Sequence, residues 1–113
     1  MSLDVYISAV RTVNVYNGNI THNLNKMAKE VKLSNGRTLY EVLWCPEEHN
    51  YTKASEIAPL LVEGIMILCS ERERFLPFNP PNGYGNYENL VQFTQNYLNA
   101  CLENPDGEIQ ACR

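Results

Sequence analysis

The sequence predicts an α+β fold: a mainly helical single domain of three to four helices, with a small antiparallel sheet formed by the N- and C-terminal strands. Three observations lead to this prediction. The N-terminal residues alternate in polarity, several later segments repeat apolar residues at helical spacing, and the C-terminus offers one more short strand. With 113 residues and no linker-like stretch, residues 1–113 are expected to form one domain.

The N-terminal segment is predicted to be a half-buried strand or a bent pair of strands, because every second residue is apolar. The residues that carry this alternation are Leu3, Val5, Ile7, Ala9, Val13 and Val15. Asn17 and Gly18 form a turn dipeptide, since both residue types tolerate a positive φ. This turn is expected to end the strand region.

Helical spacing replaces the alternation after this point. Apolar residues in the segment 24–31 recur at i, i+3, i+4 and i+7, which predicts a helix with Thr21 as its N-cap. A short helix carrying Trp44 is expected from Leu39 onward. Pro46 ends it, because the residue before a proline avoids the helical region.

The segment 57–68 has a broad apolar stripe and is expected to be the core helix, capped by Thr52 or Ser55. The segment 75–87 combines three prolines, two glycines and four aromatic residues. Such a composition excludes a helix or a central strand and predicts an ordered, packed loop.

The last helix is predicted to begin near Asn86 and to end at the turn 104–107, which contains both proline and glycine. Residues 108–112 then form a short strand. Since the other strand signal lies at the N-terminus, the simplest topology pairs the two ends of the chain in an antiparallel sheet.

Charge and composition exclude several classes of function. The net charge of −4 and the isoelectric point near 5.1 have the wrong sign for general nucleic-acid binding, although they leave a small anionic ligand open. No segment reads as a transmembrane helix or a signal peptide, so a cytoplasmic protein without a membrane partner is expected. The four cysteines are too widely spaced for a zinc site and are expected to be free thiols; no cofactor is predicted.

The stretch around residue 21 is the first candidate site. A helix start offers unpaired N–H groups, so His22, Asn23 and Lys26, together with Thr21, are predicted to hold a phosphate or carboxylate. The structural alternative is that Thr21 only caps the helix, while His22 lies at the surface or in a satisfied hydrogen bond.

Lys53 and the loop residues Asn82, Tyr84 and Tyr87 are the remaining candidate ligand-binding residues. The tyrosines are expected either to stack on a planar ligand or to fill the core, and the loop lacks the pattern of a P-loop. The sequence Cys45-Pro46-Glu47-Glu48-His49 combines a thiol, two carboxylates and an imidazole, which leaves a metal site or acid–base chemistry open. The same residues also suit an ordinary first helical turn, so no catalytic residue is assigned.

Several motifs resemble a family of small uncharacterised proteins from bacterial, phage and prophage genomes. They are NITHNLNKMA, LYEVLW followed by PEE, KASEI, FNPPNGYGNYENLVQF and YLNAC, and they cover most of the chain from about Asn19 onward. The chain departs from this family in the stretch KLSNGRT, in Cys45, where arginine is frequent, and in Tyr84, where tryptophan is usual. The resemblance brings no known activity. It implies a phage accessory protein that acts in the host cytosol.

The predicted function is binding and sequestration of a small anionic ligand, such as a nucleotide immune signal of the host, by a homo-oligomer without enzymatic activity. This role would be anti-defence. The alternative is a protein-binding inhibitor that blocks a host enzyme through an acidic surface. The residues concerned are Glu47, Glu48, Glu71 and Glu73. A third hypothesis is a small metal-dependent hydrolase built on His22, His49 and the paired acids.

Overall fold

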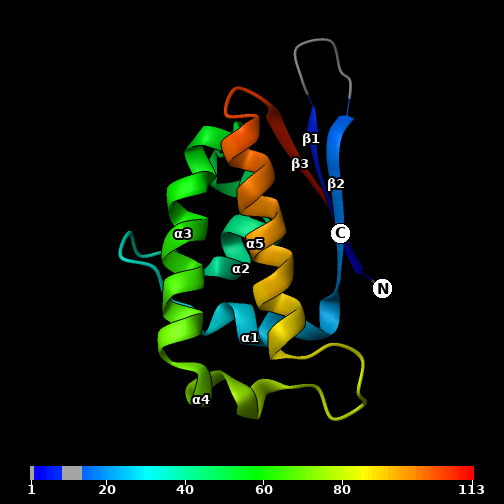
Figure 1. The fold of residues 1–113 in the computed structure, drawn as a ribbon, viewed down its shortest axis with the longest axis vertical. Helices are drawn as coiled ribbons and strands as arrows, with labels where there is room; N and C mark the ends of the chain where they lie inside the picture. The colour runs from blue at the N-terminus through cyan, green and yellow to red at the C-terminus, as the bar shows by residue number, and fades with distance from the viewer. Residues whose placement is uncertain (1, 9–13) are drawn as a thin grey trace.

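The computed structural model describes residues 2–8 and 14–113, in which a layer of helices packs against a three-stranded antiparallel sheet (Figure 1). The strands are β1 (Ser2–Ser8), β2 (Asn14–Thr21) and β3 (Glu108–Cys112), in the spatial order β2-β1-β3. The N- and C-terminal strands therefore form one small sheet, and the predicted α+β class is confirmed. Ala9 and Val13, which belong to the predicted alternation, lie outside the described residues.

Five α-helices are present in the described part of the chain, together with three short 3-10 helices. The α-helices are α1 (Asn25–Lys29), α2 (Leu39–Trp44), α3 (Ala54–Ser70), α4 (Arg72–Phe75) and α5 (Tyr87–Glu103). The 3-10 helices are His22–Leu24, Pro46–His49 and Leu76–Phe78. The long helices α3 and α5 pack against each other, and α5 also contacts β2.

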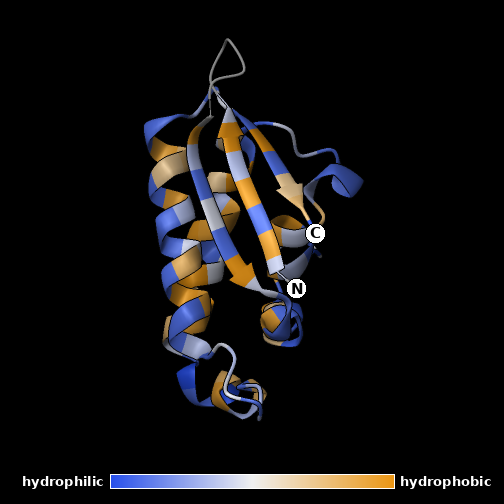
Figure 2. Cartoon of the chain, turned by 90° about the vertical axis from the view of Figure 1, so that its right-hand side faces the viewer, coloured by the Kyte–Doolittle hydropathy of each residue, from blue (hydrophilic) through white to orange (hydrophobic). Residues whose placement is uncertain are grey.

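The central strand β1 shows why the sheet packs on one side. Leu3, Val5 and Ile7 are fully buried, whereas the residues between them are only half-buried. Because successive side chains of a strand point to opposite faces, one face of β1 lies on the core. In Figure 2 the strands lie in front of the helices, and the outer face of the sheet is turned toward the viewer.

The predicted turn at Asn17-Gly18 is wrong. Both residues lie inside β2, where Gly18 pairs with Val5 and Asn17 with Tyr6. Glycine at this position has a packing role, because a Cβ added to Gly18 would lie 2.7 Å from the hydroxyl of Tyr16 and would displace that side chain. Glycine therefore allows the Tyr16 ring to lie across the strand, instead of marking a reversal of the chain.

The helix starts are set by local hydrogen bonds. Thr21 Oγ1 accepts a bond from Asn23 N at 3.3 Å, as predicted for a cap, although the helix it caps is the 3-10 turn. Asn86 caps α5 in the same way, with 2.9 Å between its Oδ1 and Asn89 N. Each cap satisfies N–H groups that the first helical turn leaves unpaired.

The start of α3 differs from the predicted cap at Thr52 or Ser55. Lys53 occupies the N-cap position, and the Glu56 carboxylate accepts bonds from Thr52 N and Lys53 N at 2.7 and 2.9 Å. The carboxylate reaches back from the third helical position and takes over the role expected of a cap hydroxyl. These two bonds tie residues 52–53 to the first turn of α3, and separate contacts pair the same residues with the start of β3.

The core contains large side chains from every part of the chain, including Trp44, Tyr97 and Phe75. Phe75 and Tyr87 are buried at the two ends of the predicted loop segment, but Tyr84 is 71 % exposed, so the loop is packed at its ends and open at its tip. The exclusion of helix is wrong for residues 76–78, which form a 3-10 helix, because a proline is tolerated in the first helical turn. Within the described residues, no helix combines the length and the apolar character that crossing a bilayer would require.

Candidate functional site

Two adjoining hollows lie around the end of β2 and the loop that precedes α5. The first, here called the loop hollow, has a volume of about 520 Å³ and is lined by His22, Asn23, Asn25, Lys26 and residues 77–82. The second, here called the edge groove, has a volume of about 800 Å³ and runs between β2 and α5. Both volumes fall in the range of small-molecule sites, and Asn23 lines both hollows.

The loop hollow combines apolar walls with a few polar groups. Its walls come from Pro77, Phe78, Pro80 and Pro81, while amides and the Lys26 amine supply hydrogen-bonding groups. Lys26 is exposed and makes no ion pair with any described residue. A free cation beside apolar walls suits a ligand that has both an apolar and an anionic part.

His22 is anchored from inside the protein. The indole N–H of Trp44 donates to His22 Nδ1 over 2.9 Å, and Trp44 itself is 1 % exposed. Since Nδ1 accepts this bond, the imidazole carries its proton on Nε2. His22 therefore offers an N–H donor whose ring orientation is fixed by a buried partner.

The loop that separates the two hollows depends on two glycines. Gly83 and Gly85 have φ values of 77° and 93°, which only glycine adopts readily. A Cβ at Gly85 would also lie 2.7 Å from Thr21 Cγ2, so glycine lets the loop approach the end of β2. Asn23 Nδ2 donates to Tyr84 O at 3.5 Å, a long bond that connects the loop to the 3-10 turn.

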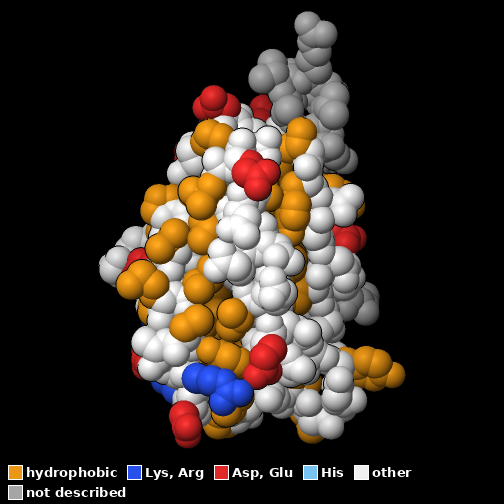
Figure 3. All heavy atoms as spheres, in the orientation of Figure 1, with side chains coloured by type: hydrophobic (Ala, Val, Ile, Leu, Met, Phe, Trp, Pro, Cys, Tyr) orange, Lys and Arg blue, Asp and Glu red, His pale blue; other side chains and the backbone are white. Residues whose placement is uncertain are grey.

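The edge groove carries no charged side chain. Thirteen residues line it: Tyr16, Asn17, Gly18, Asn19, Ile20, Thr21, Asn23, Tyr84, Gly85, Asn89, Gln92, Phe93 and Asn96. Partial burial, followed by the proximity of Cys101, raises the pKa of Tyr16 above its usual 10.0, so its hydroxyl stays neutral. Figure 3 shows uncharged side chains along α5, with acidic side chains only at intervals.

Six of the eight predicted ligand-binding residues line these hollows. His22, Asn23, Lys26 and Asn82 line the loop hollow, and Thr21, Asn23 and Tyr84 line the edge groove. Segments that are 60 residues apart in the chain thus meet here because α5 returns alongside β2, as Figure 1 shows.

The other two predicted residues lie elsewhere. Lys53 pairs with Glu108, which is opposite Ser8, whereas Thr21 is opposite Ser2 at the other end of β1. Tyr87 is 5 % exposed, and its hydroxyl donates to Leu68 O at 2.6 Å. Lys53 therefore belongs to the far end of the sheet, and Tyr87 fills the core, which was the structural alternative.

The amide side chains of α5 are the feature that the sequence analysis missed. Asn89, Gln92 and Asn96 line the edge groove from one side of the helix. Their spacing of three and four residues places them on one helical face, and this polar face was a signal available in the sequence. It was overlooked because polar side chains on a helix usually face water.

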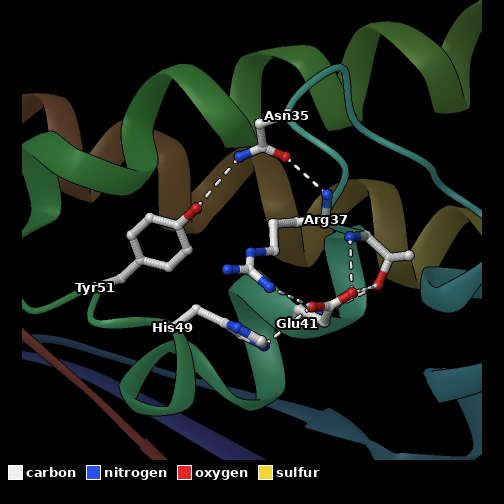
Figure 4. A network of polar contacts seen from close by, with 6 residues as sticks. Asn35, Arg37, Glu41, His49 and Tyr51 are labelled. Atoms are coloured by element: carbon white, nitrogen blue, oxygen red, sulfur yellow. Dashed lines mark hydrogen bonds and ion pairs between the residues drawn. The ribbon is translucent and has the colours of Figure 1, made fainter.

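The two histidines do not converge. His49 Nε2 lies 3.0 Å from Glu41 Oε2, and the same carboxylate is 3.7 Å from Arg37 Nη1 (Figure 4). His22 is bonded to Trp44 instead. Within residues 2–8 and 14–113, no group of three His, Cys, Asp or Glu side chains is placed to hold a metal ion.

The acidic residues of the inhibitor hypothesis are largely paired. Arg113 Nη1 contacts Glu47 Oε1 at 2.8 Å, and Arg113 Nη2 lies 3.8 Å from Glu48 Oε2. Arg74 likewise contacts Glu71 at 2.8 Å. Two arginines therefore already offset half of the charge of the four acids in this hypothesis, which a basic partner would have to meet.

Comparison with known proteins identifies no relative: no protein-family model, no curated protein and no solved structure matches this chain.

Proposed function

We propose that the protein binds a small anionic ligand in the loop hollow and sequesters it from other proteins. The observation that carries this proposal is the combination, in one hollow of about 520 Å³, of apolar proline walls with the unpaired Lys26 amine and the anchored His22. The anionic group would lie at Lys26 and the Nε2–H of His22, and the rest of the ligand against Pro80 and Pro81.

Sequestration requires binding without turnover, and the hollow suits that role. Its polar groups are amides, one amine and one imidazole, and the two cysteines that are buried, Cys45 and Cys101, do not line it. The inhibitor hypothesis has less support because Arg113 and Arg74 pair with the acids. The hydrolase hypothesis lacks the convergence of histidines that it needs.

The first experiment is native mass spectrometry of the protein as purified from its expression host, which reads the subunit number and any retained mass together. A retained small anion, or a nucleotide mass, is the expected result. Retained compounds, together with a panel of mononucleotides, then serve as probes in solution.

Trp44 is the single tryptophan of the chain and reports on the hollow through its bond to His22, so its fluorescence can follow each titration. Lys26→Ala is expected to weaken binding about tenfold or more, since a hydrogen bond to a charged group contributes about 1.5–3 kcal/mol. Lys32→Ala is the matched control, because Lys32 is exposed but does not line the hollow. Equal affinities of the two variants, or no fluorescence response to any probe, would contradict the proposal.

A further inference from the structure

The free edge of β2 forms one wall of the edge groove. Residues 16–21 all line it, although alternate residues of a strand point to opposite faces of the sheet. Six consecutive residues can line one groove only if it runs along the edge of the strand. The groove therefore gives access to the backbone of β2 as well as to its side chains.

This backbone edge has no partner within the described chain. β2 pairs with β1 on one side, and among the described residues no other strand pairs with it. Alternate residues of a strand direct both N–H and C=O to the same edge, so six residues present about three of each. Such a row of unpaired groups is a template for an added strand.

The described part of β2 also lacks two usual forms of edge protection, charged residues and proline; its register irregularity lies at residues 14–16, at the start of the strand. Its sequence, NVYNGNIT, contains no charged residue and no proline. Proteins normally place charges, prolines or a covering segment on an exposed edge to prevent strand addition. An unprotected neutral edge inside a groove is therefore better explained as a binding surface than as an ordinary edge.

The opposite wall, formed by α5, offers hydrogen-bonding side chains to the outer edge of an added strand. Gln92 and Asn96 both line the groove, and Gln92 Nε2 donates to Asn96 Oδ1 at 2.8 Å, which leaves Gln92 Oε1 as an acceptor and Asn96 Nδ2 as a donor. Asn89 Oδ1 accepts from Asn86 N at 3.0 Å, and its Nδ2 remains a donor. Backbone groups of a segment that lies in the groove would thus find partners on both sides.

We propose that the edge groove binds an extended, uncharged peptide segment of about six residues, which adds to β2 as a fourth strand. Six residues of strand span roughly 20 Å. The absence of charged side chains among the thirteen lining residues selects against segments rich in Asp, Glu, Lys or Arg, because a charge buried in the groove would have no partner. This site is separate from the loop hollow and goes beyond the proposed function.

A single extended segment fits the groove better than a second copy of this chain. Two copies that paired through β2 would each bring α5 alongside the same edge, and the two helices would meet. An isolated extended peptide brings no helix of its own to this edge. Self-association through β2 is therefore an outcome that would overturn the proposal.

The test uses a displayed library of random heptapeptides, selected on the full-length protein and counter-selected on Asn96→Trp, which fills the groove. Enriched sequences are expected to lack charged residues and proline. Asn99→Trp is the matched control, because Gln95 and Asn99 form the same amide pair at 2.9 Å on α5 but do not line the groove. Equal melting temperatures of the two variants establish that both fold.

Enriched peptides are then synthesised with blocked ends and with N-methyl groups on alternate residues. Methylation of the N–H groups that face β2 is expected to weaken binding about tenfold or more, because several backbone hydrogen bonds are lost, while methylation of the other edge has a smaller effect. The proposal fails if no sequence is enriched over the Asn96→Trp control, or if both methylation patterns act alike. It also fails if sedimentation shows a wild-type dimer that Asn96→Trp dissociates.

Discussion

The two outer edges of the sheet differ in whether another segment pairs with their backbone groups. The β3 edge is covered by the segment that leads into α3, since Ile109 N donates to Thr52 O at 2.9 Å and Lys53 pairs with Glu108. The adjacent bond from Ala54 N to Gly107 O, also 2.9 Å long, extends this closure. The β2 edge has no comparable cover within residues 2–8 and 14–113.

This difference separates a structural edge from an accessible one. The β3 edge uses its backbone groups internally and carries the charged residue Glu108, so it stabilises the fold and resists strand addition. The β2 edge leaves its backbone groups to water or to a ligand, in a neutral groove. Four substitutions test whether the closed edge carries more of the stability of the protein than the open edge.

The largest effect is expected from Gly107→Ala at the closed edge. A Cβ there would collide with Ile7 Cγ2 and lie 3.2 Å from Asn104 O, where backbone and core leave no space. Overpacking of this kind lowers the free energy of unfolding by about 1–3 kcal/mol. Urea denaturation followed by circular dichroism measures the loss.

Gly18→Ala is the matched control at the open edge. Its Cβ would meet only the Tyr16 ring, with the hydroxyl 2.7 Å away, and this flexible side chain can turn aside. The free energy of unfolding is expected to change by less than about 1 kcal/mol, because the cost of moving the Tyr16 ring is offset by the gain of about 0.5–1 kcal/mol that alanine brings over glycine in a strand. Equal losses in the two variants would remove the distinction between the edges.

A smaller effect is expected from Glu56→Gln. This substitution weakens the hydrogen bonds from Thr52 N and Lys53 N to the Glu56 side chain, here called the clamp. The backbone N–H of Thr52, and then that of Lys53, hold the pKa of Glu56 below its usual 4.5. A carboxylate whose pKa is lowered by folding stabilises the protein above its unfolded pKa, and this contribution is lost as the pH falls through the folded pKa. The variant should therefore be less stable than the wild type at neutral pH and converge with it in acid.

Thermal unfolding over a pH series measures this convergence, and hydrogen exchange of the Ile109 amide reports the clamp directly. Glu103→Gln is the control, because Glu103 is exposed and has no hydrogen bond or ion pair in the described chain. A stability difference that persists unchanged in acid would show that the charge of Glu56 is not responsible.

The smallest effect is expected from Arg113→Ala, next to the end of β3. The hydrogen bond with Glu47 is the main cause that raises the pKa of Arg113, and the guanidinium also donates to Trp44 O. Because this ion pair is exposed, its loss should lower the free energy of unfolding by no more than about 1 kcal/mol. A loss as large as that of Gly107→Ala would mean that the C-terminal contact, and not the clamp, secures the closed edge.

Local patterns in the sequence were sufficient for the order of the elements. The alternation of Leu3, Val5 and Ile7 predicted a strand with one buried face, and the spacing of 24–31 predicted helical structure after Thr21. The pairing of the two ends of the chain could also be predicted, because two strands in one small domain need each other as backbone hydrogen-bonding partners. These features depend on backbone geometry and side-chain periodicity within a few residues.

Predictions failed where a distant contact overrides the local preference. Asn17-Gly18 reads as a turn, yet β1 pairs with it and the Tyr16 ring occupies the space above Gly18. The cap of α3 was assigned to a hydroxyl, but the Glu56 carboxylate accepts the bonds from Thr52 N and Lys53 N, while Thr52 O and Lys53 pair with the start of β3. Tertiary contacts of this kind outweigh the small free energies of turn and cap preferences.

The candidate site divides in the same way. The sequence by itself indicated polar residues near Thr21 and in the loop 82–84 as candidates, because polarity and glycine content belong to each residue. Only the tertiary structure decided that Lys53 lies at the far end of the sheet, that Tyr87 fills the core, and that His22 is held by Trp44. The physical reason is that a binding site is a set of long-range distances, which the packing of α5 against β2 fixes and no local pattern encodes.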